Sequence, residues 1–214
     1  MTKVKICGIA NSDDALQAAV LGADYLGFLV EIDFSEDSIT REEAEQLIKK
    51  LPLEVQPVLV TYHQQATPII HLADAIKPQL IQLHNDITLE EIGKIRQALP
   101  KIKLTKTISV TDASSLEEAK KFEKHVDFIL LDTKIGERKG GTGKTHDWTV
   151  SAEIVKQLST PVFLAGGLNP ENVAEAIKTV QPYAVDVNSG VKATAKRKDH
   201  KKMEQFIRGA KHGN

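Results

Sequence analysis

The chain has 214 residues, of which 41% are hydrophobic and 27% charged, a composition typical of a water-soluble globular protein. Its 28 basic and 29 acidic residues leave a formal net charge of -1, so we expect no nucleic-acid partner and no membrane partner. A single cysteine excludes an internal disulfide, and no apolar run approaches the roughly 20 residues of a membrane span. We therefore expect a cytoplasmic protein.

Short β-rich segments alternate with helical patterns along the whole chain, and no Pro/Gly/Ser-rich linker divides it. The expected strands cover residues 4–7, 25–30, 55–60, 80–83, 103–108, 128–131, 162–165 and 184–187. The expected helices lie near residues 12–21, 41–51, 66–76, 88–98, 114–125, 151–158, 170–179 and 199–210. Eight strand-then-helix units predict a single-domain (β/α)8 TIM barrel over residues 1–210, followed by a frayed tail at 211–214.

Two proton-transferring residues fall at the ends of expected strands. Cys7 closes the first apolar strand, and Asp132 follows the apolar run 128–131. In (β/α)8 barrels the chemistry gathers at these strand ends, so a thiol and a carboxyl there could act as proton acceptor and donor without a metal or a cofactor. Two plainer interpretations stay open, in which Cys7 is a small buried apolar residue and Asp132 caps the following loop.

Three further polar residues accompany this pair. Strand alternation puts Lys5 on the same face as Cys7, one layer below it, where a buried ammonium needs a partner such as Asp186 or Asp132. Such a cation would also favour a thiolate at Cys7. Asp186 interrupts an otherwise apolar strand, which indicates an inward polar group, and His84 ends another strand as either a site residue or a structural histidine.

Glycine turns after the sixth, seventh and eighth expected strands indicate a phosphate-binding site. They contain Gly141 and Gly143, Gly166 and Gly167, and Ser189 with Gly190. The loops after the last two strands commonly hold a phosphate through backbone N–H groups. Each turn alone is ordinary, but the three together predict a phosphorylated small-molecule substrate.

Seven short segments along the chain form a specific combination: Lys5-Ile6-Cys7-Gly8-Ile9, Gly22-Ala23-Asp24 with Gly27-Phe28, Gln82-Leu83-His84, Leu130-Leu131-Asp132-Thr133, Gly140-Gly141-Thr142-Gly143 with Asp147-Trp148, Gly166-Gly167-Leu168-Asn169-Pro170-Glu171-Asn172-Val173, and Asp186-Val187-Asn188-Ser189-Gly190-Val191. Together they resemble the phosphoribosylanthranilate isomerase family of tryptophan biosynthesis. The resemblance implies a cofactor-independent Amadori rearrangement of N-(5-phosphoribosyl)anthranilate to 1-(2-carboxyphenylamino)-1-deoxyribulose 5-phosphate. Asp132 would be the general acid, Cys7 the general base, and the protein a monomer or a homodimer.

One departure from the family pattern concerns the substrate carboxylate. The family usually has an arginine after the second strand that contacts the anthranilate part, and Asp37 stands at the matching position. An anion there would repel a carboxylate, which leaves two alternatives open: a paralogue that isomerises another phosphorylated sugar, and a non-catalytic barrel that binds a phosphometabolite. Arg41 or Arg138 could substitute for the missing arginine. On this interpretation, Asp37→Arg is expected to improve the handling of phosphoribosyl anthranilate.

Overall fold

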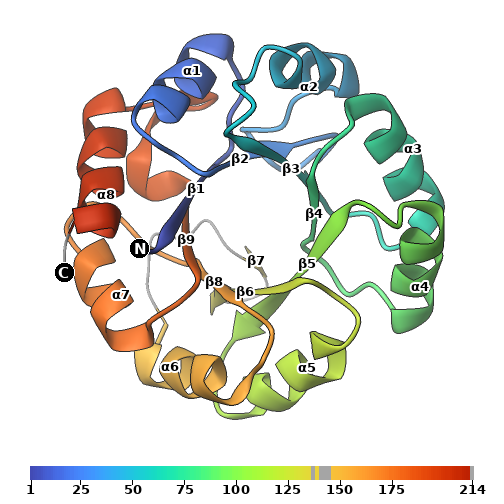
Figure 1. Ribbon diagram of the computed structural model, residues 1–214, viewed down its shortest axis with the longest axis vertical. Coiled ribbons are helices and arrows are strands. Elements are labelled where there is room, and N and C mark those ends of the chain that lie inside the picture. Colours follow the sequence, from blue (N-terminus) through green and yellow to red (C-terminus); the bar gives the residue numbers. More distant parts are fainter. Residues whose placement is uncertain (136–137, 140–145, 213–214) are drawn as a thin grey trace.

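The computed structural model describes residues 1–135, 138–139 and 146–212, and it contains a closed barrel of eight parallel strands (Figure 1). Neighbours around the barrel follow the order β5-β4-β3-β2-β1-β9-β8-β6, and pairing of β5 with β6 closes the ring. The barrel strands are β1 (Lys3–Cys7), β2 (Tyr25–Leu29), β3 (Gln56–Thr61), β4 (Leu80–Leu83), β5 (Lys103–Val110), β6 (Phe128–Ile135), β8 (Val162–Leu164) and β9 (Ala184–Val187). The predicted (β/α)8 fold is confirmed.

Helices surround the barrel, and each crossover returns the chain to the start of the next parallel strand (Figure 1). They are α1 (Ser12–Val20), α2 (Arg41–Ile48), α3 (Ala66–Ile76), α4 (Leu89–Ala98), α5 (Ser114–Glu123), α6 (Trp148–Gln157), α7 (Val173–Val180) and α8 (His200–His212). Side-chain caps begin several of them. At α2, for example, Thr40 and Glu43 form a reciprocal capping box.

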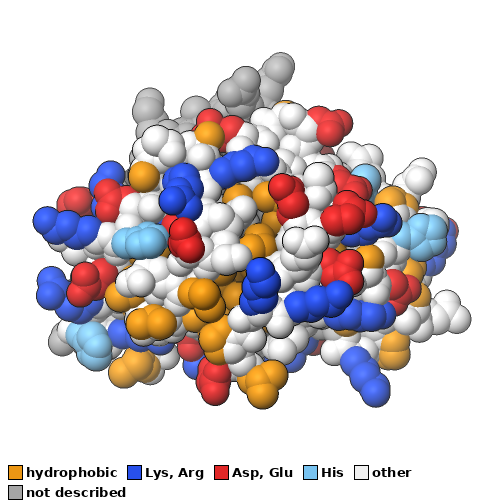
Figure 2. Space-filling model, turned by 90° about the horizontal axis from the view of Figure 1, so that it is seen from above, with side chains coloured by type: hydrophobic (Ala, Val, Ile, Leu, Met, Phe, Trp, Pro, Cys, Tyr) orange, Lys and Arg blue, Asp and Glu red, His pale blue; other side chains and the backbone are white. Residues whose placement is uncertain are grey.

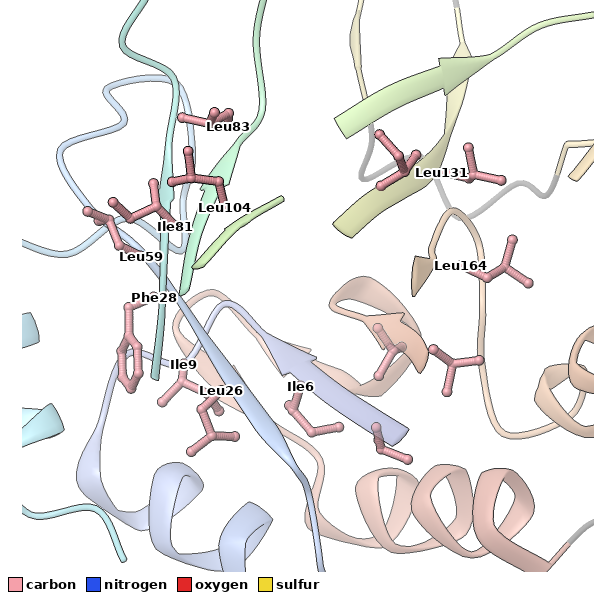
Figure 3. Packing of buried hydrophobic residues seen from close by; sticks show 14 of the residues in the cluster. Ile6, Ile9, Leu26, Phe28, Leu59, Ile81, Leu83, Leu104, Leu131 and Leu164 are labelled. Carbon is pink, nitrogen blue, oxygen red and sulfur yellow. The ribbon is translucent and has the colours of Figure 1, made fainter. Parts of the chain in front are cut away.

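Alternation along the strands divides the apolar residues into two layers. On β1, Val4 and Ile6 belong to the outer cluster between strands and helices, whereas Cys7 belongs to the inner cluster. Figure 3 shows the outer cluster, to which Ile6, Leu26 and Leu164 contribute from three different strands. Every barrel strand is therefore buried on both faces, as parallel strands require.

Aromatic side chains fill the barrel near the beginnings of its strands. Phe163 contacts Tyr25 and Phe128 edge-on, with ring centroids 5.2 Å and 5.3 Å apart. Tyr183 stacks on Phe128 at 5.4 Å, and its hydroxyl lies 3.0 Å from that of Tyr25. This packing closes one end of the barrel, so that the inward-facing polar residues beyond it collect at the opposite end.

Three features differ from the sequence prediction. Strand β6 runs past Asp132 to Ile135 and pairs with the short antiparallel strand β7 (Arg138–Lys139). A second antiparallel hairpin, β10 (Lys192–Thr194) with β11 (Arg197–Lys198), follows the 3-10 turn η1 (Ser189–Val191). Helix α8 continues to His212, and Lys211 forms an ion pair with Asp24 at 3.2 Å. The prediction of a frayed tail is therefore wrong for residues 211 and 212.

The surface carries charges of both signs. Figure 2 shows basic and acidic side chains interspersed over the face that it presents. Among the described residues, no helix combines the length and the apolar character that a membrane span requires.

The outer apolar layer predicts a strong dependence of stability on its leucines. Leu26 is 0% exposed in this layer, whereas Leu53 is 94% exposed in a connecting segment. Leu26→Ala should lower the free energy of unfolding by about 2–5 kcal/mol, because it leaves a cavity among packed side chains. Leu53→Ala, the matched control, should change it by less than about 0.5 kcal/mol. Urea unfolding followed by circular dichroism measures both, and equal losses would contradict the layered packing.

Candidate active site

Cys7 is the last residue of β1, and its side chain faces the barrel interior. Gly27 lies beside it on β2, in register with Cys7. A Cβ atom on Gly27 would stand 2.8 Å from the thiol sulfur and 3.1 Å from Cε of Lys5. The absence of a side chain at Gly27 therefore makes room for both groups at the mouth of the barrel.

Lys5 and Asp186 form a buried ion pair one layer below the thiol. They are register partners on β1 and β9, and Nζ of Lys5 donates to Oδ2 of Asp186 at 2.8 Å. Burial opposes the charge on Lys5, but Asp186 and Cys7 outweigh it and raise the pKa of Lys5 above its ordinary value. The expectation that a carboxylate would accompany this buried lysine is confirmed, and the partner is Asp186.

The Cys7 thiol holds its proton more tightly than an ordinary cysteine. Burial raises its pKa above the usual 9.0, and the nearby cations of Lys5 and Lys198 offset this only in part. Lys5 therefore lowers the pKa of Cys7 as expected, but the opposite effect of burial on this pKa is larger. The group is a thiol at neutral pH, and a thiolate forms there at a free-energy cost.

Asp132 lies within β6, buried, with its backbone opposite Ser109 of β5. Burial raises the pKa of its carboxyl to about 7, although the Thr133 N–H donates to Oδ1 at 2.8 Å and favours the charged form. A carboxyl with this pKa is partly protonated at neutral pH. It can donate a proton to a weakly basic oxygen.

His84 follows β4 and faces Asp132. Its Nε2 lies 3.7 Å from Oδ2 of Asp132, and its Nδ1 lies 3.0 Å from the amide nitrogen of Gln82. Because that amide nitrogen can only donate, Nδ1 accepts, and in a neutral ring Nε2 carries the hydrogen. Gln82 therefore orients the imidazole so that an N–H is directed toward the Asp132 side of the mouth.

An aromatic wall formed by Phe34, Tyr62 and His84 borders the same opening. The Tyr62 ring lies 4.8 Å from Phe34, edge-on, and 4.8 Å from His84. Burial and the charges of Asp132 and Cys7 raise the pKa of Tyr62, so both groups lie within electrostatic range of one ring. The sequence interpretation missed Phe34 and Tyr62. The sequence signal that could have identified them is the position of each aromatic residue shortly after the end of an expected strand.

The glycine turns after β8 and β9 lie side by side on the rim. Gly166 and Gly167 have φ angles of 86° and 69°, a backbone conformation that favours glycine. A side chain on Gly190 would clash with the Leu168 carbonyl, so the two turns are in contact. Among the described residues, no backbone carbonyl accepts a hydrogen bond from the N–H of Gly166 or Gly167. Ser189 is exposed beside them, whereas Gly141 and Gly143 fall outside the described residues.

Asp37 is buried and fully engaged by its own chain. Its carboxylate pairs with Nζ of Lys192 at 2.6 Å and accepts from the Asn188 amide at 3.2 Å and the Lys196 N–H at 3.1 Å. Burial opposes ionisation, but Lys192 and Lys196 hold the pKa of Asp37 below its ordinary value. The expected bare anion facing the substrate is therefore absent from this position.

The arrangement is that of a (β/α)8-barrel protein with a thiol, a weakly acidic carboxyl and a histidine around one mouth, beside paired glycine turns. The family model described as N-(5'phosphoribosyl)anthranilate (PRA) isomerase matches residues 4–209. An N-(5'-phosphoribosyl)anthranilate isomerase of Methanocella arvoryzae is 42% identical over 207 residues, covering 97% of each chain. The chain therefore belongs to the N-(5'-phosphoribosyl)anthranilate isomerase family.

Solved structures agree with this assignment. The phosphoribosyl anthranilate isomerase of Thermotoga maritima is similar with a TM-score of 0.89 and 37% identity, covering 99% of each chain. A second isomerase structure, in complex with reduced 1-(o-carboxyphenylamino)-1-deoxyribulose 5-phosphate, has a TM-score of 0.86 and 34% identity, again over 99% of each chain.

The raised pKa of Asp132 predicts a pH-dependent stability. A carboxyl whose pKa rises from 3.8 to about 7 on folding binds its proton more tightly in the folded state, so stability falls as the pH rises between these values. Asp132→Asn removes this titration. The stability of the variant relative to the parent protein should therefore increase between about pH 4 and pH 7, as measured by urea unfolding. A difference independent of pH would contradict the raised pKa.

Proposed function

We propose that this protein isomerises N-(5'-phosphoribosyl)anthranilate to 1-(2-carboxyphenylamino)-1-deoxyribulose 5-phosphate, with Asp132 as general acid and Cys7 as general base. The observation that carries the proposal is the pairing of an inward thiol with a carboxyl of pKa about 7 at one barrel mouth. The family to which the chain belongs supports the same reaction.

The rearrangement needs only proton transfers. Asp132 donates its proton to the furanose ring oxygen as the C1–O bond breaks, and the anilino nitrogen lone pair forms the iminium. The Cys7 thiolate then removes the C2 proton, which gives an enolamine. Protonation at C1 and loss of the proton on the C2 oxygen complete the ketone. Because no electron leaves the substrate, the proposed route needs neither a metal nor a cofactor.

The phosphate end of the substrate would lie at the turns after β8 and β9. Backbone N–H groups of Gly166, Gly167 and Gly190, with the Ser189 hydroxyl, are suitable donors for a phosphate dianion. A role for Gly141 and Gly143 stays a prediction, as do a cytoplasmic location and the choice between monomer and homodimer.

His84 and Asp186 would support the two reacting groups. Asp186 keeps the Lys5 ammonium charged beneath Cys7, which lowers the cost of forming the thiolate. His84 would direct its Nε2 hydrogen to a substrate oxygen beside Asp132. Tyr62 and Phe34 offer an aromatic surface for the anthranilate ring.

The alternative of a paralogue for another phosphorylated sugar rested on Asp37. Its charge is neutralised by Lys192, so it gives little reason to expect rejection of a carboxylate. Complementation of a tryptophan auxotroph that lacks this isomerase tests the proposed reaction. Growth is expected, and failure to grow with soluble, folded protein would favour the paralogue.

Substitution of either reacting group should reduce turnover. We expect Cys7→Ala and Asp132→Asn each to lower kcat by at least about a hundredfold, since each removes one proton-transfer group. Asp127→Asn is the matched control, because Asp127 pairs with Arg96 at 2.5 Å near the opposite end of the strand that carries Asp132. Near-normal kcat in Cys7→Ala or Asp132→Asn, measured from the rate of substrate consumption, would remove the assignment.

The pH dependence of catalysis follows from the two pKa values. The acid titrates at about 7, whereas the base titrates above 9.0, so the reactive combination of thiolate and protonated carboxyl is a minor form. Its fraction rises with pH up to about 7 and then levels off, because further loss of the Asp132 proton balances the gain in thiolate. The measured kcat/KM should follow this curve. A maximum near pH 5 would contradict it.

A further inference from the structure

The proposed substrate carries a carboxylate on its aromatic ring, and a carboxylate that leaves water needs a cation. Among the described residues, three lysines lie around the mouth of the barrel. Lys5 is neutralised by Asp186 at 2.8 Å, and Lys192 by Asp37 and Glu36 at 2.6 Å and 2.7 Å. Lys198 is the third. The alternative Arg41 is exposed at the start of α2 and pairs with Glu42, and the side chain of Arg138 is outside the described set.

Lys198 projects from β11 toward Cys7. Its Nζ donates to Oδ1 of Asn188 at 2.6 Å. The same Asn188 oxygen lies 2.7 Å from the place where a Cβ on Gly8 would stand, and Gly8 directly follows Cys7. The charge on Lys198 also lowers the cost of ionising Cys7. The ammonium therefore lies at the edge of the reacting centre.

This ammonium is buried with a neutral partner. Lys198 is 5% exposed, and within the described part of the chain no carboxylate reaches ion-pair distance from its Nζ. Asp37 and Asp14 favour its charge from farther away, yet burial prevails and lowers its pKa to about 8. A buried cation that lacks a contacting anion is costly, and an incoming carboxylate would relieve that cost.

The surrounding contacts hold Lys198 in this position. Asp14 on α1 accepts from the Lys198 backbone N–H at 2.8 Å and from His200 at 2.8 Å. The Asn188 amide donates to Asp37 at 3.2 Å, which turns its oxygen toward Lys198. Asp37 therefore orients the amide that receives the lysine.

We propose that Lys198 binds the ring carboxylate of the substrate, in the role for which the family pattern has an arginine at the Asp37 position. This inference rests on the proposed isomerase function. The Lys198 ammonium would form a hydrogen-bonded ion pair with the substrate carboxylate beside Cys7. Asn188 and Asp37 would be positioning residues.

The test compares two substrates that differ only in the carboxylate, N-phosphoribosyl anthranilate and N-phosphoribosyl aniline. Lys198→Met should lower kcat/KM for both compounds, because the Cys7 thiolate loses a nearby cation, but the loss for the anthranilate compound should be about ten- to a hundredfold larger than that for the aniline compound. Lys198→Arg should retain part of the preference. The exposed Lys201→Met on α8 is the matched control and should leave both values unchanged.

The ratio of the two kcat/KM values is independent of the fraction of folded protein, so partial misfolding of a variant leaves the test intact. Equal losses on both substrates, or no loss on either, would overturn the assignment of Lys198. A parent protein inactive on both compounds would instead reject the isomerase function itself.

For Asp37→Arg, the structure predicts the opposite of what the sequence predicts. The substitution would remove the ion pair between Asp37 and Lys192 and would place the arginine near the buried Lys198. The value of kcat/KM for the anthranilate compound should therefore fall rather than rise. A rise in this value would count against Lys198 and in favour of an arginine site.

Discussion

The ion pair between Lys5 and Asp186 is the interaction on which the site depends. It joins the first and the last barrel strands at one register position, inside the barrel, with both side chains buried. Loss of either partner would leave an uncompensated buried charge, which is far more costly than loss of a surface pair. Because the pair stands directly below Cys7, the position and the electrostatics of the thiol follow from this closure.

Burial controls the protonation of the reacting groups. It favours the neutral forms of both Cys7 and Asp132, and it leaves an acid that titrates near 7 opposite a thiol that titrates above 9.0. Lys5 and Lys198 supply the positive potential that makes a thiolate accessible. The same burial therefore keeps a proton on Asp132 for donation, and it makes the ionisation of Cys7 dependent on the nearby lysines.

Charge around the β10/β11 hairpin is organised as a connected network. Lys192 neutralises Asp37, Asp37 orients Asn188, and Asn188 receives Lys198. An aspartate at an expected arginine position is therefore accommodated by lysines that lie 155 or more residues later in the sequence. Low local dielectric makes each of these contacts stronger and each unpaired member more costly, so the network acts as a unit.

The sequence by itself determined the alternation of strands and helices, the barrel, and the inward positions of Lys5, Cys7 and Asp186, because periodicity and strand parity are local properties. Only the tertiary structure decided that Asp37 is neutralised, that Asp132 titrates near 7, and that Tyr62 and Lys198 border the mouth. These depend on burial and on contacts between residues far apart in the chain, for which a single sequence carries no periodic signal.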